Sequence, residues 1–266
     1  MLGKNADGYW KNEDLVSQMK FVNPIFKAYH PNCDLLYCFD NSSNHHAKCP
    51  DGLCAESLNL TDGGKNTPIM RNTTFNGTEF KMQTDLGVSK GVRSILMERG
   101  KWRADLNLKC KECHLDPNFA CCGRRMLSLE DDFKAQQGWL AETATTLGVS
   151  IIFLPKFHCE LNFIEMIWGY VKANLRRACE FSFRDLREKL TAMLMKGIPQ
   201  DFFKKAYIHC LRCMDAYRQG YTGPLLDYAM KKNKGHRLIP VDQKQMIHEE
   251  YEKKITSKQE KYYYVN

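Results

Sequence analysis

The sequence has no hydrophobic run long enough to cross a membrane. A transmembrane helix needs about 20 consecutive apolar residues, and no such run occurs in the 266 residues. The first ten residues are polar and lack the apolar segment of a signal peptide. We therefore expect neither a membrane protein nor a secreted one, and we interpret the Asn-x-Ser/Thr sequences as chance matches in an Asn-rich segment.

The chain also lacks an internal repeat and a helix-turn-helix that could read base edges. It does carry an excess of positive charge, +8 at neutral pH, and 43% apolar residues. The apolar fraction supports a real core in one large domain or in one domain with a sizeable insertion. The charge fits a phosphate-bearing partner, although many basic proteins bind no nucleic acid.

The hydrophobic pattern predicts a mixed α/β core. Apolar residues at spacings of three and four predict a helix over 12–29 with Asn12 as its N-cap, and a second one over 162–179. Short apolar runs at 34–40 and 149–155 predict two buried strands. A helix followed by an almost wholly apolar strand is typical of a sheet that is covered on both faces.

Four parts follow from this pattern. Residues 1–48 form the first part of the core, and residues 49–148 a Cys-rich insertion in which only 91–102 and 127–147 look partly helical. Residues 149–222 form the second part of the core with C-terminal helices. In that part, Ser182 with Asp185 resembles a capping box for a helix to about Lys196, and 201–218 is helical. Residues 223–266 are predicted to be a basic, flexible tail, because they are Lys-rich and aperiodic beyond Lys231.

Two acidic residues stand where an element opens onto a loop. Asp40 ends the first predicted strand, and Glu165 lies near the start of the 162–179 helix. Two-metal phosphodiester cleavage needs carboxylates around two cations, and Mg²⁺ prefers oxygen ligands. Alternatively, Asp40 is a turn residue and Glu165 is a solvated helix residue. Spacing and periodicity do not decide between these interpretations.

A family resemblance favours the first interpretation. Residues 160–165, Glu-Leu-Asn-Phe-Ile-Glu, followed by Trp168, resemble the third-acid motif of mariner-like DDE transposases, with Phe163 where the family has Pro. Residues 39–45, Phe-Asp-Asn-Ser-Ser-Asn-His, resemble the second-acid motif. The segments 8–10, 156–160 and 214–218 resemble a Cys-rich branch of DDE-superfamily endonucleases. The resemblance covers roughly residues 1–220.

The resemblance implies an RNase H-like core in which Asp40 and Glu165 bind Mg²⁺ or Mn²⁺ for cleavage and joining of DNA strands. It also places Lys172, Arg176 and Arg177 on a helix that flanks the DNA, although a solvated helix face is the simpler interpretation of each one. DNA as substrate implies the nucleus. Oligomeric state stays open.

The family's first acid, an Asp on an early strand, has no counterpart before the 12–29 helix. Asp7 lies in a polar segment with no apolar strand before it. We therefore expect an incomplete core that lacks its first strands, and a chain that is inactive as written, so enzyme status is undecided. The alternative is a non-catalytic, transposase-derived module that binds DNA or protein and is stabilised by zinc. An unrelated zinc-stabilised interaction protein is a third possibility.

The twelve cysteines include one cluster with metal-ligand spacing. Cys110 and Cys113 are followed by the adjacent pair Cys121 and Cys122, with His114 as a substitute ligand. Four thiolates can hold one structural Zn²⁺, while core or surface thiols and a redox pair are the alternatives.

The remaining cysteines divide by their surroundings. Those expected to be packing or core residues are Cys33, Cys38, Cys179, Cys210 and Cys213. Cys49 and Cys54 stay undecided, with a weak second site beside His45 or His46 as one option. A Cys159–His158 nucleophile pair is disfavoured because no third orienting group is evident.

Overall fold

The computed structural model describes residues 10–111, 119–178, 180, 182–235 and 238–263, with side chains described as far as residue 256. The chain forms two compact units, and the boundary between them passes through two strands. The first unit comprises Met1–Tyr37 and Asn41–Ile152, and the second comprises Cys38–Asp40 and Phe153–Asn266. None of the described helices is both long and apolar enough to span a bilayer.

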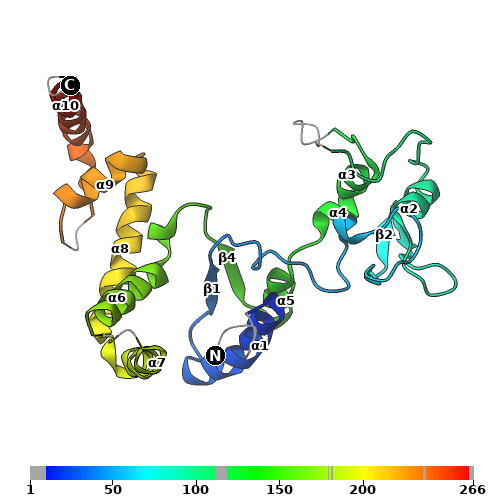
Figure 1. Cartoon of the computed structure of the whole chain (residues 1–266), viewed down its shortest axis with the longest axis horizontal. Coiled ribbons are helices and arrows are strands. Elements are labelled where there is room, and N and C mark those ends of the chain that lie inside the picture. Colours follow the sequence, from blue (N-terminus) through cyan, green and yellow to red (C-terminus); the bar gives the residue numbers. More distant parts are fainter. Residues whose placement is uncertain (1–9, 112–118, 179, 181, 236–237, 264–266) are drawn as a thin grey trace. The chain divides into compact units, whose positions relative to one another are not determined.

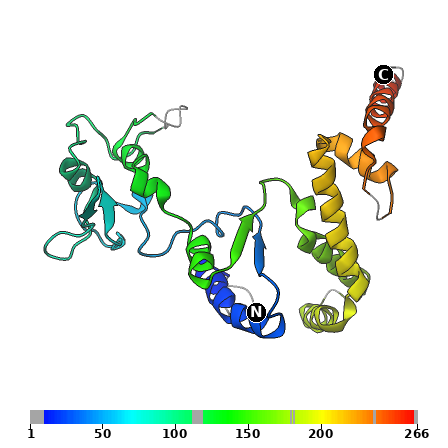
Figure 2. The ribbon, with the colours of Figure 1, turned by 180° about the vertical axis from the view of Figure 1, so that it is seen from behind.

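Helix α1 (Asn12–Tyr29) has the bounds that the sequence predicts. It packs against α5 (Trp139–Leu147) through a face that includes the buried Val16 (Figures 1 and 2). The expected N-cap is wrong, because Lys11 occupies that position and its N–H donates to the Asp14 carboxylate at 2.7 Å. Asn12 is buried instead, and its side-chain amide donates to the Asn44 carbonyl at 2.6 Å.

Strands β1 (Leu36–Phe39) and β4 (Ser150–Phe153) pair with each other. The Ser150 N–H donates to the Leu35 carbonyl at 3.2 Å, and the Leu154 N–H donates to the Phe39 carbonyl at 2.8 Å. From the first bond to the second, both strands advance by four residues in the same direction, so they run parallel. Their carboxyl ends therefore share one edge of the sheet.

The expectation that both strands are fully buried is wrong. Each strand alternates between exposed and half-buried residues. The Tyr37 hydroxyl donates to the Met19 carbonyl of α1 at 3.4 Å, so the half-buried face lies toward that helix. Leu36 and Ile152 are 49% and 42% exposed. Cys38 shares the exposed face, and its predicted place in the core is wrong, as is that of the exposed Cys33.

The insertion has a hydrophobic core of its own. Its elements are the 3₁₀ turn η1 (Ala55–Ser57), the hairpin β2 (Thr73–Phe75) and β3 (Thr78–Phe80), and the helices α2 (Val92–Glu98), α3 (Gly123–Ser128) and α4 (Asp131–Ala135). Its buried cluster extends along the sequence from Leu53 to Phe133. Helix α5 packs on α1 instead, so this compact part ends before the predicted boundary at residue 148.

A buried arginine holds the hairpin to α4. The Arg99 side chain is fully buried and makes a two-pronged ion pair with Asp132, at 3.0 and 2.7 Å. Its guanidinium also lies over the rings of Phe75 and Phe80, at 4.4 and 4.6 Å from their centroids. Cation–π contacts strengthen when the cation is desolvated. Arg99 is therefore a central residue of the insertion's core.

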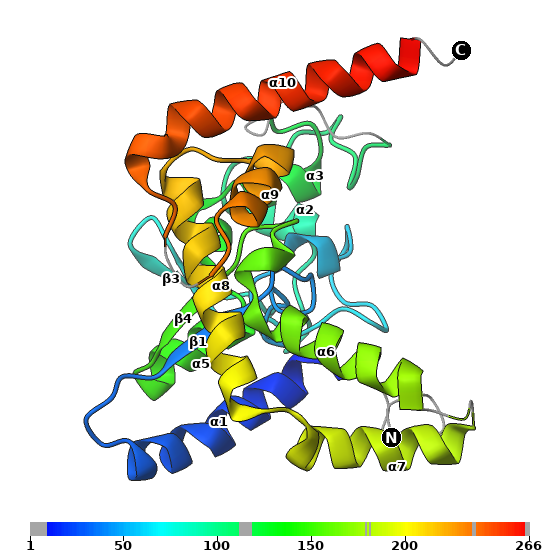
Figure 3. The ribbon, with the colours of Figure 1, turned by 90° about the vertical axis from the view of Figure 1, so that its left-hand side faces the viewer.

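The second unit is helical. Its elements are η2 (Cys159–Leu161), α6 (Phe163–Ala178), α7 (Phe183–Ala192), a π-helical turn η3 (Met193–Gly197), α8 (Gln200–Arg218), α9 (Gly223–Lys232), η4 (Val241–Gln243) and α10 (Lys244–Tyr263). Helix α6 packs against α7 and α8 (Figure 3). The predicted helices over 162–179 and 201–218 are confirmed within a residue, and Ser182 caps α7 by accepting from the Asp185 N–H.

The segment after Lys231 differs from the loose tail that the sequence predicts. Helices α9 and α10 contribute Leu226, Ala229 and Ile247 to a buried cluster with Tyr221, and Ile239 joins it from the connection between them. Beyond Lys231, the connection contributes only Ile239 and α10 only Ile247 to the buried residues of this cluster. The sequence beyond Lys231 therefore shows no periodic apolar pattern.

Candidate functional site

The two predicted metal-binding acids both lie in the second unit. Asp40 directly follows the carboxyl end of β1, and Glu165 lies in the first turn of α6. Both side chains are exposed. Because β4 runs parallel to β1, the chain leaves the same sheet edge at Leu154 and reaches α6 through η2. The stacked rings of Phe39 and Phe153, 6.3 Å apart, join the strand ends at that edge.

No third acid completes the pair among the described residues. Neither Asp40 nor Glu165 belongs to a group of three side chains there that could share one metal ion. Beside Asp40, the Asn41 side-chain oxygen lies 3.0 Å from Nε2 of His46. His45 and His46 likewise join neither Cys49 nor Cys54 in such a group within the described part of the chain.

A hydrogen-bonded cluster anchors the loop that leads to Glu165. The Tyr217 hydroxyl of α8 donates to the Glu160 carboxylate in η2. Nδ1 of His158 lies 2.8 Å from the same carboxylate oxygen and 3.0 Å from the Tyr217 oxygen. A carboxylate only accepts, so Nδ1 carries the proton in the His158–Glu160 bond. These contacts tie the start of α6 to α8.

This cluster shifts the acidities of its members. Partial burial raises the pKa of Glu160, but the hydrogen bonds from Tyr217 and His158 outweigh it and hold that pKa below its usual value. Burial and the Glu160 carboxylate together raise the pKa of Tyr217. At neutral pH the cluster therefore consists of an ionised Glu160 with two donors.

Sequence reasoning did not identify Glu160 or Tyr217 as site residues. Their segments, 156–160 and 214–218, are two of those that carry the family resemblance. Nothing in either segment alone shows that they meet. The contact joins residues 57 positions apart, which composition and periodicity do not reveal.

The cysteines near this cluster have packing environments. Cys210 and Cys213 are buried on α8, as predicted. Burial raises the pKa of the Cys213 thiol to about 11. Burial, followed by the charge of Arg212, lowers the pKa of His209. Cys159 is exposed, while the neighbouring His158 is bonded to Glu160 and Tyr217, so nothing supports a Cys–His nucleophile.

Lys172, Arg176 and Arg177 lie in the second half of α6, and all three are exposed. They follow Glu165 along the same helix, whose other face buries Ile167 and Val171. A positive patch at this position can contact phosphates. A solvated helix face gives the same exposure, so the DNA contact stays a prediction.

The structure brings together three of the four predicted zinc ligands. The sulfur atoms of Cys110, Cys121 and Cys122 lie within 4.8 Å of one another, and those of Cys110 and Cys121 are 3.3 Å apart. Cys113, His114 and Cys179 lie outside the described residues. The three thiols form the one group of three or more potential metal ligands in the described part of the chain.

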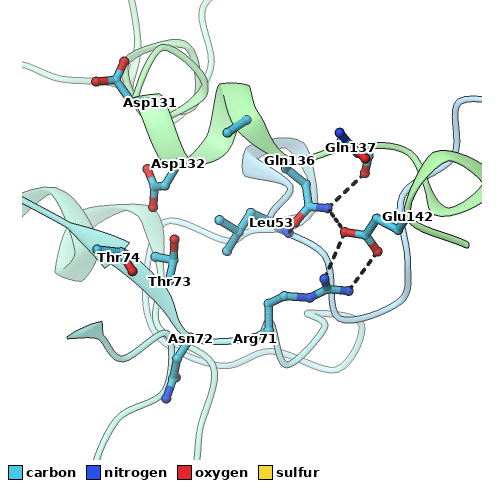
Figure 4. Close-up of a pocket in the computed structure, with 11 residues that line it drawn as sticks. Leu53, Arg71, Asn72, Thr73, Thr74, Asp131, Asp132, Gln136, Gln137 and Glu142 are labelled. Atoms are coloured by element: carbon cyan, nitrogen blue, oxygen red, sulfur yellow. Dashed lines mark hydrogen bonds and ion pairs between the residues drawn. The ribbon is translucent and has the colours of Figure 1, made fainter. Parts of the chain in front are cut away.

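A pocket of about 620 Å³ lies between the insertion and α5 in the first unit (Figure 4). Its polar wall is built on Arg71, which bonds Glu142 of α5 at 2.9 Å and Asp51 at 2.6 Å. Gln136 donates to the same Glu142 at 2.7 Å. Arg71 bonds carboxylates from both sides, so this polar wall is a structural joint between the insertion and α5.

Comparison with known proteins identifies no relative. No family model matches the chain, and neither a curated protein nor a solved structure matches it.

Proposed function

We propose that this chain carries two acids of a DDE-type metal centre, Asp40 and Glu165, and derives from a transposase that cleaves and joins DNA with Mg²⁺ or Mn²⁺. The observation that carries the proposal is the position of the two acids. Asp40 ends one strand of a parallel pair, and the loop from the neighbouring strand's carboxyl end leads to Glu165. Sites in α/β sheets form at the carboxyl ends of the strands.

The anchored loop adds support to this proposal. A metal ligand has to be held in place by the structure around it. The residues before Glu165 are fixed to α8 through Glu160 and Tyr217. On the strand side, the stacked Phe39 and Phe153 rings hold the edge from which Asp40 projects.

Manganese binding tests the proposal. Electron paramagnetic resonance measures free Mn²⁺ in a titration with the purified chain. We expect Asp40→Asn and Glu165→Gln each to weaken binding by about tenfold or more, since each removes a charged oxygen ligand. The matched controls are Asp34→Asn, an exposed acid before the same strand, and Glu188→Gln, an exposed acid on α7. Equal binding by all four variants and the unaltered chain would overturn the proposal.

A second candidate function is non-catalytic binding of DNA by the same unit. The exposed cations Lys172, Arg176 and Arg177 and the net charge of +8 favour it. Binding through phosphates weakens steeply with salt. Fluorescence anisotropy with duplex DNA should therefore show a steep salt dependence that becomes shallower in a triple Glu variant of these residues. Unchanged DNA binding by that variant would exclude this surface.

A plasmid-nicking assay separates the two candidates. Cleavage with Mg²⁺ or Mn²⁺ that is abolished by Asp40→Ala identifies an enzyme. DNA binding without nicking identifies the binding module.

A further inference from the structure

The insertion places three cysteine thiols at one corner of its core. Cys122 is 1% exposed, while Cys110 and Cys121 are half-buried. The sulfur atoms of Cys110 and Cys121 are 3.3 Å apart, and all three sulfur atoms lie within 4.8 Å of one another. Two thiolates bound to one tetrahedral Zn²⁺ at about 2.3 Å each lie about 3.8 Å apart. That spacing falls within the 4.8 Å limit that encloses all three sulfur atoms.

Backbone hydrogen bonds bring these thiols together. The Gly123 N–H donates to the Asn107 carbonyl at 2.8 Å, and the Arg124 N–H donates to the Leu108 carbonyl at 3.0 Å. The segments that end at Cys110 and begin at Cys121 therefore run alongside each other. The lack of a side chain at Gly123 allows this close approach, because a Cβ there would lie 2.9 Å from the Val92 side chain of α2.

From this geometry we infer that Cys110, Cys121 and Cys122 are ligands of a structural Zn²⁺ in the insertion. Three converging thiolates repel one another unless a cation or protons neutralise them, and zinc is the common metal partner of such a set. The site belongs to the insertion's core and is independent of Asp40 and Glu165.

Zinc at this position would hold the insertion together at the start of a short helix. Helix α3 begins at Gly123, directly after the thiol pair, and has six residues. Its Leu127 and the preceding Leu106 are buried in the core that Val92 shares. A metal that holds Cys110 to Cys122 fixes both segments against that core. Small structural units commonly rely on such a metal for stability.

Metal analysis of the full chain, purified under reducing conditions, tests the inference. Mass spectrometry should find about one zinc ion per chain. Replacement by Co²⁺ should give the intense thiolate-to-metal absorption and the visible bands of a tetrahedral site. Cys110→Ser and Cys121→Ser should each lose most of the bound zinc. Cys33→Ser, at an exposed cysteine of the first unit, should keep it.

Alkylation of the unaltered chain is a second test, and it does not depend on whether a variant folds. Bound zinc should protect Cys110 and Cys121 from iodoacetamide, and chelation should expose them, while Cys33 reacts equally in both states. The inference is overturned by a chain that holds no zinc and shows the same alkylation with and without chelator. A disulfide between Cys110 and Cys121 that persists under the reducing conditions of purification would also overturn it.

Discussion

Removal of a single oxygen atom, in Tyr217→Phe, tests whether α8 anchors the loop before Glu165. The Tyr217 hydroxyl donates to an ionised Glu160. A hydrogen bond to a charged group contributes about 1.5–3 kcal/mol. The Glu160 side chain is 26% exposed, and solvent screening reduces the expected loss to about 1–2 kcal/mol. The phenyl ring can keep its edge-on contact with His158.

Hydrogen exchange read by mass spectrometry measures this loss where it occurs. A loss of about 1–2 kcal/mol raises the open population of the loop roughly 5- to 30-fold, and peptides that cover 155–165 should exchange faster by that factor. Tyr207→Phe is the matched control. It makes the same chemical change on the same helix, at a side chain that is 54% exposed.

The Glu160 carboxylate provides the second position of a double-mutant cycle. Glu160→Gln should lower protection by a similar amount, and Tyr217→Phe added to it should cost little more, because the two residues share one interaction. The reasoning is refuted if Tyr217→Phe and Tyr207→Phe behave alike, or if the effects of the two cluster variants simply add.

Three further predictions concern other parts of the chain. The folded state holds the pKa of Glu160 below its ordinary value of 4.5. The ionised Glu160 therefore stabilises the fold above pH 4.5, and this contribution is lost as the pH falls through the folded-state pKa. Urea unfolding from pH 7 to 3 should show that the stability difference between the unaltered chain and Tyr217→Phe disappears. Arg99→Met should destabilise the insertion by about 3–5 kcal/mol because it leaves the Asp132 carboxylate buried and uncompensated. Arg99→Lys should recover only part of the lost stability in the same unfolding assay. Equal stability of the unaltered chain and both variants would contradict the structural role of the ion pair. Cys213, with its pKa raised to about 11, should react with iodoacetamide at least tenfold more slowly than the exposed Cys33, and equal rates would show that α8 is open.

The sequence predicts the bounds of the long helices better than it predicts which strand residues are buried. Helices α1 and α6 have apolar residues at regular helical spacing over four or more turns, which accounts for the accuracy of their predicted bounds. The burial of β1 and β4 was overestimated, because an apolar run shows only that burial is favourable. Whether Leu36 and Ile152 are covered depends on neighbouring elements. The hairpin was missed although Asn76-Gly77, both at positive φ, is a strong turn signal.

The candidate site was predictable only in part. Asp40 and Glu165 were identified through a motif resemblance, and their roles as metal ligands stay predictions. The meeting of Cys110 with Cys121 and Cys122 was expected from spacing, and the structure shows it. The contact of Tyr217 with Glu160 depends on how α8 packs on η2. Such long-range packing leaves no local pattern in the sequence.

The parallel pairing of β1 with β4 has a consequence for how the chain folds. More than a hundred residues separate the two strands along the chain, and closing so long a loop carries an entropic cost that slows folding. The insertion shortens that search. Once its own core forms, the Trp139 N–H reaches the Ala47 carbonyl at 2.9 Å, so the two ends of the loop already lie together. We therefore expect the insertion to fold first and the sheet to assemble afterwards.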